Sequence, residues 1–321
     1  MVDRKQKRIE WVDIARGIAI ICMVAGHTSI PEVLSKYIWS FHMPLFFVVS
    51  GLFFNPDKLG SFKVFIKRRL RTLIIPYWFF TFIVITGYLG TEYFKPIQII
   101  EGWTGYALWF VPVLFCAELV FYPISKLKRE WLTLTVIFLT AIGYILSESH
   151  IRLYFKLDVV PFAIFFIAFG YLFKNSIFNT KPNLLIATSI GLITIVLSIF
   201  LPKLDMAKND FGWIILNLSN ALLGIYFIFS VSKYLSLANK IWPIRFIDYF
   251  GRNSLFVMAF SQLFNYWIIV GLSILGIGSF FGLCLRYIIL FSAIYIAANL
   301  LTHYTPALVG KINRTHANDT K

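Results

Sequence analysis

The sequence predicts an all-α fold: a polytopic transmembrane helix bundle of about ten helices, with both termini cytoplasmic. Hydrophobic residues make up 59% of its 321 residues and charged residues only 14%, whereas soluble domains average roughly 45–50% and about 25%. Apolar stretches long enough to cross a bilayer recur along the whole chain. The short connectors between them are basic, as cytoplasmic loops of membrane proteins are. This composition excludes a water-soluble globular domain.

Ten segments have the length and hydropathy of membrane spans. The first follows a basic N-terminus but contains Asp13 and Arg16, so we interpret it as an uncleaved helix and not as a signal peptide. No long linker is present, which predicts one integral membrane domain over residues 1–321 with a short cytoplasmic tail at 303–321. The predicted spans are residues 10–28, 37–54, 72–90, 106–125, 131–147, 157–173, 184–201, 213–232, 253–271 and 280–302.

The basic residues support this order of spans. With the N-terminus in the cytoplasm, 22 of the 30 lysines and arginines fall in inside segments and 6 in outside loops, while Arg16 and Arg286 lie within spans. Missing one span would reverse every later loop and spoil this asymmetry. The net charge of +15 is therefore interpreted as a topology signal, and we expect a lipid bilayer and no nucleic acid as partner.

Three ionisable residues in the first span need an explanation, because each costs at least ~2.5–3.5 kcal/mol on membrane-insertion scales. Arg16 and His27 are 11 residues apart, which at ~100° and ~1.5 Å per residue places them on one face about 16 Å apart. Asp13 falls within about 40° of that face. Asp13 and Arg16 are either a buried ion pair that orients the helix or part of a functional site.

His27 is a candidate general base. The second span contains His42, and the short hairpin between the two spans brings both histidines to a similar depth. Imidazole titrates near neutral pH and is the commonest general base in enzymes. His42 is either part of the same site or a brace for the helix at Pro44.

A basic run precedes the third span. Arg68 and Arg71 would share a face of a helix, and two guanidinium groups suit a phosphate. The alternative is that the run only holds its loop in the cytoplasm. Glu118 and Arg286 also lie within spans, where either could line a polar cavity. The sequence has no phosphate-binding loop, no dinucleotide fingerprint and no metal-ligand set.

Five segments together resemble the acyltransferase-3 family of membrane O-acyltransferases, especially its members that acetylate fucose and exopolysaccharides. This chain departs from the family pattern in the segment at 251–262, where members often have His at the position of Gln262. The segments are RIEWVDIARGIAIICMVAGH (8–27), SFHMPLFFVVSGLFF (40–54), FIKRRLRTLIIPYW (65–78), LWFVPVLF (108–115) and GRNSLFVMAFSQ (251–262).

The resemblance implies an O-acetyltransferase of the cell membrane. Acetyl-CoA from the cytoplasm would be the acyl donor, and a hydroxyl of a cell-envelope or exported carbohydrate would be the acceptor. Some relatives carry an extracytoplasmic hydrolase-like domain, which we do not expect here because the chain stops at Lys321. The membrane domain would then act alone or with a separate envelope biosynthesis partner.

The resemblance and the residue pattern together suggest roles for the candidate residues. His27 would be the general base, Arg16 would help to hold the donor, and Asp13 would orient Arg16. Ser50 is a nearby hydroxyl if a covalent acyl-enzyme forms, and Phe110 would help to shape the acyl channel. The remaining assignments are Arg68, Arg71 and Trp109 to the donor, and His42, Glu118 and Asn253 to the acceptor.

Two rival functions fit the same composition. A transporter or flippase for an anionic or lipid-linked sugar would use intramembrane Arg, His and Glu as substrate or proton sites. Such a protein would show no dependence on coenzyme A. A scaffold without enzymatic activity in a polysaccharide export complex would tolerate the loss of His27.

Overall fold

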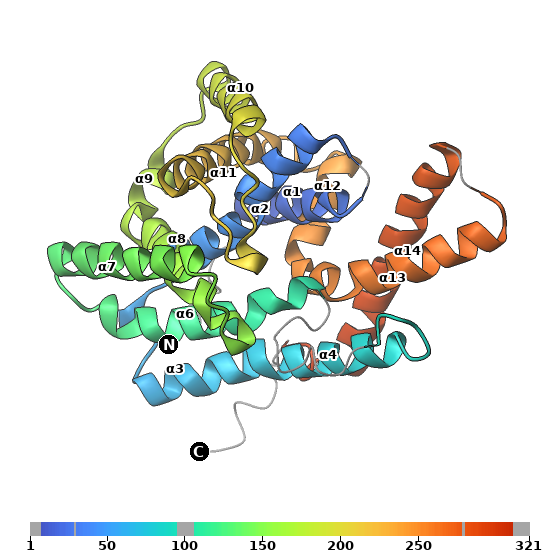
Figure 1. Cartoon of the computed structure of the whole chain (residues 1–321), viewed down its shortest axis with the longest axis horizontal. Helices are drawn as coiled ribbons and strands as arrows, with labels where there is room; N and C mark the ends of the chain where they lie inside the picture. The colour runs from blue at the N-terminus through green and yellow to red at the C-terminus, as the bar shows by residue number, and fades with distance from the viewer. Residues whose placement is uncertain (1–7, 29, 95–105, 278–279, 311–321) are drawn as a thin grey trace. The chain divides into compact units, whose positions relative to one another are not determined.

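The computed structural model describes residues 8–28, 30–94, 106–277 and 280–310, and within these ranges it contains helices and no strand. The all-α prediction is therefore confirmed for the described part of the chain (Figure 1). The elements are α1 (Glu10–Gly26), α2 (Glu32–Phe53), η1 (Pro56–Lys58), α3 (Phe62–Arg69), η2 (Leu70–Ile74), α4 (Ile75–Gly87), η3 (Tyr106–Trp109), α6 (Phe110–Ile124), α7 (Arg129–Glu148), η4 (Tyr154–Val159), α8 (Val160–Leu172), α9 (Lys174–Asn179), α10 (Leu184–Phe200), η5 (Met206–Lys208), α11 (Ile214–Ser236), α12 (Trp242–Arg252), α13 (Ser254–Ile274) and α14 (Phe280–Tyr304).

Each of the ten predicted spans contains a helix, and eight helical stretches among the described residues are long and apolar enough to cross a membrane. The other two predicted spans correspond to α1 and α10, which have 17 residues each. The chain thus has the helices of a multi-pass membrane protein. The number ten and the cytoplasmic position of both termini stay predictions, and residues 311–321 of the predicted tail lie outside the described residues.

The helices group into two compact units, which we describe separately; the single membrane domain stays a prediction. Unit 1 comprises Met1–Phe54, Thr133–Ile151 and Pro161–Ser254. In it α1 packs against α2, α11 and α12, while α10 packs against α2 and α11 (Figure 1). Its core contains fully buried aromatic side chains such as Phe41, Phe47 and Phe166.

Glycines set the closest helix contacts of unit 1. A Cβ on Gly17 of α1 would overlap a backbone carbonyl oxygen of α12, and a Cβ on Gly251 of α12 would overlap one of α1. In the same way, a Cβ on Gly51 of α2 would overlap a backbone carbonyl oxygen of α8, and a Cβ on Gly170 of α8 would overlap one of α2. Small residues allow this approach in membrane helix pairs. Two of the segments that resemble the family therefore contain a glycine that joins α1 to α12.

The connection between α10 and α11 is held by contacts within unit 1. The Asn217 side chain donates hydrogen bonds to the carbonyl oxygens of Phe211, at 2.8 Å, and Pro202, at 3.2 Å. The Phe211 ring stacks on Phe162 with ring centroids 3.6 Å apart. These contacts fix the backbone on both sides of Lys203.

Unit 2 comprises Asn55–Leu132, Arg152–Val160 and Leu255–Lys321. In it α3, η2 and α4 form one continuous helix that begins at Phe62, so the predicted start of this helix at residue 72 was wrong by ten residues. The basic run forms helix because Lys and Arg are good helix formers and Ser61 caps its N-terminus by accepting the Val64 N–H at 3.4 Å.

The middle of this helix, η2, is a π-turn. The Ile75 N–H donates to the Leu70 carbonyl, five residues back. Pro76 follows directly and lacks the N–H that an α-helix would direct at the carbonyl of Thr72. Such π-turns often accompany functional sites, and they change the angular spacing of side chains on either side.

Candidate functional site

His27 and His42 both lie against the indole of Trp39. His27, an exposed residue, is the C-cap of α1, and its ring meets Trp39 edge-on with centroids 5.4 Å apart. His42, one helical turn beyond Trp39 on α2, meets the same indole at 5.6 Å. Both histidines therefore contact the same indole ring, and their predicted similar depth in the membrane stays a prediction.

The two imidazoles differ in what they can do. His42 is only 3% exposed, and its Nδ1 lies 2.8 Å from the Ile38 carbonyl oxygen. A carbonyl can only accept, so Nδ1 carries the proton and its tautomer is fixed. His27 is exposed at the end of its helix and can meet a substrate. His27 is therefore accessible to a bound molecule, whereas His42 is enclosed by the protein.

Lys203 completes this group, which we call the indole cluster (His27, Trp39, His42 and Lys203). Its ammonium lies 3.7 Å from the centroid of the Trp39 ring, a close cation–π contact. Burial lowers the pKa of Lys203, and the nearby Asp205 carboxylate opposes that shift.

Sequence reasoning missed both Trp39 and Lys203. The spacing of Trp39, three residues before His42 on a helix, was a usable signal. Lys203 lies far away in the sequence, and nothing in its spacing points to Trp39.

Asp13 and Arg16 are in contact, as the helical spacing predicted. The Asp13 carboxylate accepts a hydrogen bond from Arg16 Nη1 at 3.5 Å and a shorter one from Arg8 Nε at 2.7 Å. The Arg16 guanidinium also lies 5.9 Å from the centroid of the Phe53 ring. Asp13 thus holds two arginines at one end of α1, whereas His27 stands at the other.

Asn253 lies at the junction of α12 and α13. It is the C-cap of α12, it is 9% exposed, and its side-chain amide donates to the Tyr249 carbonyl at 3.0 Å. Two residues earlier, Gly251 contacts the backbone of α1 at Asp13. This segment therefore packs beside the Asp13 end of α1, and the predicted contact of Asn253 with an acceptor stays a prediction.

In unit 2 the basic run divides into one buried contact and several exposed side chains. Arg69 forms a bidentate pair with Glu118: Nη2 donates to Oε1 at 2.8 Å, and Nε lies 2.6 Å from Oε2. Arg68 and Arg71 are exposed, and neither has a carboxylate partner among the described residues. These two arginines are free to bind an anion, whereas Glu118 would have to leave Arg69 to contact an acceptor.

Trp109 ends η3 and is buried in unit 2. Its side chain is 4% exposed and lies edge-on to Phe110, with ring centroids 6.4 Å apart. Its predicted place beside the acyl group stays a prediction. Among the described residues no three His, Cys, Asp or Glu side chains form a group suited to a metal ion.

A family model described as an acyltransferase domain, that of the acyltransferase-3 family, matches residues 9–303. Apart from Arg8, the match covers all five segments that resemble the family, and it includes every candidate residue named from the sequence. Comparison with curated proteins and with solved structures finds no match.

Proposed function

Because the chain belongs to the acyltransferase-3 family and has the helices of a multi-pass membrane protein, we propose that this membrane acyltransferase is an O-acetyltransferase of the cell membrane. In this proposal it moves the acetyl group of acetyl-CoA to a hydroxyl of a cell-envelope or exported carbohydrate. The observation that carries the proposal is the position of His27, an exposed residue at the end of the helix that contains Arg16, with its imidazole beside Trp39.

The reaction requires a base at the acceptor hydroxyl. His27 takes the hydroxyl proton while the oxygen attacks the thioester carbonyl carbon. The new C–O bond forms, and the C–S bond of the tetrahedral intermediate then breaks. The proton held by the imidazolium passes to the departing sulfur, which leaves as the thiol of coenzyme A. Direct transfer in this way needs no covalent acyl-enzyme, which Ser50 would otherwise carry.

The dimensions of α1 favour an elongated donor. Arg16 and His27 are separated by about 16 Å along the helix, so a small anion cannot contact both. Acetyl-CoA carries phosphates at one end and its thioester at the other. Arg16 would help to hold this donor. Asp13 would position the Arg16 guanidinium through the hydrogen bond that it accepts from Arg16.

Two exposed arginines would bind the phosphates of coenzyme A. Arg68 lies just before the π-turn and Arg71 lies within it, and both lack carboxylate partners in the described ranges. Guanidinium groups bind phosphate by charge-assisted, often bidentate hydrogen bonds. Trp109 would border the acyl group, and His42 and Asn253 would support the acceptor side. Glu118 would contribute by fixing Arg69 or, after leaving it, by contacting the acceptor.

The experiment is transfer of labelled acetyl groups in isolated membranes. Membranes that contain the chain receive acetyl-CoA labelled in the acetyl group, together with envelope carbohydrate from the host. We expect label in an alkali-labile carbohydrate ester, and much less label with membranes that contain His27→Ala at equal abundance. His303→Ala is the matched control, since it changes an exposed histidine at the end of α14.

The rival functions predict different results. A transporter or flippase would move sugar across the membrane without acetyl-CoA and would leave the carbohydrate unlabelled. With a scaffold, labelling of the carbohydrate would be the same for the native chain and for His27→Ala. Labelling that is unchanged by His27→Ala would overturn the general-base role, and absence of labelling by a well-folded native chain would favour the transporter.

A further inference from the structure

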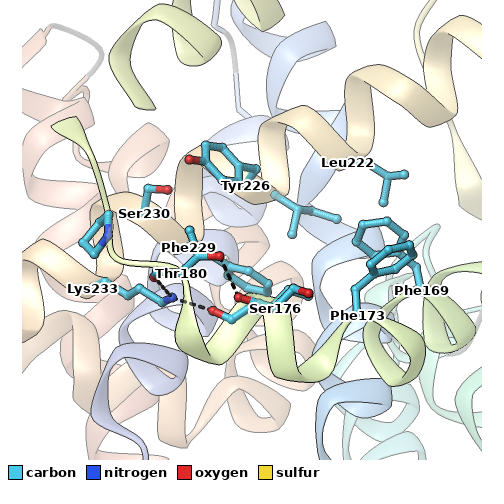
Figure 2. A pocket seen from close by; sticks show the side chains of 12 residues that line it. Phe169, Phe173, Ser176, Thr180, Leu222, Tyr226, Phe229, Ser230 and Lys233 are labelled. Atoms are coloured by element: carbon cyan, nitrogen blue, oxygen red, sulfur yellow. Dashed lines mark hydrogen bonds between the residues drawn. The ribbon is translucent and has the colours of Figure 1, made fainter. Parts of the chain in front are cut away.

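Unit 1 contains a pocket of about 220 Å³ between α8, α9 and α11, and its lining includes no residue of the indole cluster. Figure 2 shows Phe169 and Phe173 at one end of it and Lys233 at the other, with Leu222 and Tyr226 projecting from α11. Its lining is mostly aromatic and aliphatic. The pocket therefore combines an apolar interior with one cationic end.

The cationic end is not neutralised within the described chain. The Lys233 ammonium donates hydrogen bonds to the carbonyl oxygens of Ile177, at 2.5 Å, and Thr180, at 2.7 Å. An ammonium has three donors, so one more is available. Its charge also faces the Trp11 ring at 5.1 Å, and no carboxylate among the described residues lies within ion-pair distance. A phosphate at this point would supply the missing counter-charge.

The position of the pocket suits a molecule of the bilayer. Lys233 is in the last turn of α11, a helix long and apolar enough to span a membrane. The short segments at this end also carry Lys174, Lys181 and Lys240, and they are segments that the charge pattern places in the cytoplasm. Basic groups at such a boundary attract anionic lipid headgroups, while apolar walls deeper in the membrane accept an acyl chain.

We propose that this pocket binds an anionic phospholipid, with one acyl chain between α8 and α11 and the phosphate on Lys233. One wall of the pocket, Phe229, packs edge-on against Trp11 of α1 at 5.2 Å between ring centroids. The bound lipid therefore supports the helix that carries His27. This site does not depend on the proposed acetyl transfer.

The test is lipid binding to the purified full chain in neutral detergent, followed by native mass spectrometry. Phosphatidylglycerol and phosphatidylcholine with identical acyl chains are compared for the native chain, Lys233→Met and Lys240→Met. The native chain should retain phosphatidylglycerol preferentially, and Lys233→Met should lower this retention about fivefold, the effect of one basic residue on anionic lipid. Lys240→Met removes an equal charge from the same region outside the pocket and should retain the native preference.

A pocket-filling variant tests the acyl-chain half of the site. Leu222→Trp should lower retention of both lipids without changing the charge, and it carries the test if Lys233→Met fails to fold. Equal loss in Lys233→Met and Lys240→Met would overturn the proposal in favour of diffuse surface attraction. Displacement of the lipid by inorganic phosphate, or full retention by Leu222→Trp, would overturn the acyl-chain site.

Discussion

The pair formed by Arg69 and Glu118 predicts an unequal response to the loss of either partner. The Glu118 side chain is 2% exposed, whereas that of Arg69 is 25% exposed. Removing one partner of a buried ion pair costs about 3–5 kcal/mol because the other charge stays buried. We expect Arg69→Met to lower the free energy of unfolding by about 3 kcal/mol, the lower end of this range, because the Arg69 side of the pair is partly exposed to solvent.

The reverse change should cost less, because Arg69 can reach water. We expect Glu118→Gln to lower the free energy of unfolding by about 1–2 kcal/mol, near the cost of an unsatisfied polar group. Lys67→Met, which changes an exposed basic residue of the same helix, should stay within about 0.5 kcal/mol of the native value. The double variant, Arg69→Met with Glu118→Gln, should lower the free energy of unfolding by less than the sum of the two single changes, because changes at contacting residues are not additive.

The assay is unfolding of the purified chain by sodium dodecyl sulfate in mixed micelles, followed by circular dichroism. The reasoning is refuted if Arg69→Met lowers the free energy of unfolding no more than Lys67→Met does. It is also refuted if Glu118→Gln lowers it more than Arg69→Met does. Acetyl-CoA binding measured on the same samples separates stability from donor recognition. Folded Arg69→Met should bind acetyl-CoA like the native chain, because its guanidinium is engaged with Glu118.

Three further predictions concern other contacts. Gly251→Ala should destabilise the fold by about 1–3 kcal/mol through overpacking, whereas Gly271→Ala, whose Cβ would meet nothing within 4 Å, should be neutral or stabilising in the same unfolding assay. Arg68→Ala with Arg71→Ala should weaken acetyl-CoA binding at least tenfold by calorimetry, since each charge-assisted hydrogen bond contributes about 1.5–3 kcal/mol; unchanged binding would make the run a topology signal only. Lys203→Met should lower the free energy of unfolding by about 0.5–1 kcal/mol through loss of its cation–π contact, and Lys203→Arg should restore it.

Hydropathy located the long apolar helices well, because a span must be apolar over its whole length, but it gave no signal for α9 and α12. The start of the helix at Phe62 was missed for the converse reason. Its first turns are polar and basic, so hydropathy gives no signal there, although the cap at Ser61 and the helix-forming Lys and Arg do.

The candidate site was only partly predictable. The contact of Asp13 with Arg16 follows from local helical spacing. The pairing of Arg69 with Glu118 joins positions 49 residues apart. A π-turn follows Arg69, so neither spacing nor composition shows which of the neighbouring arginines meets a buried carboxylate. Lys203 contacts Trp39 from the connection between α10 and α11, far away in the sequence, and sequence periodicity does not encode such a contact.

The most direct test of the proposed function compares donor binding with acetyl transfer in His27→Gln. The native chain, His27→Gln and His303→Gln are purified into nanodiscs and given acetyl-CoA and host envelope carbohydrate. We predict that His27→Gln binds acetyl-CoA within about twofold of the native chain but transfers acetyl about 10²–10⁴-fold more slowly, the usual contribution of a general base. His303→Gln should match the native chain in both measurements. Transfer by His27→Gln at the native rate would contradict the account.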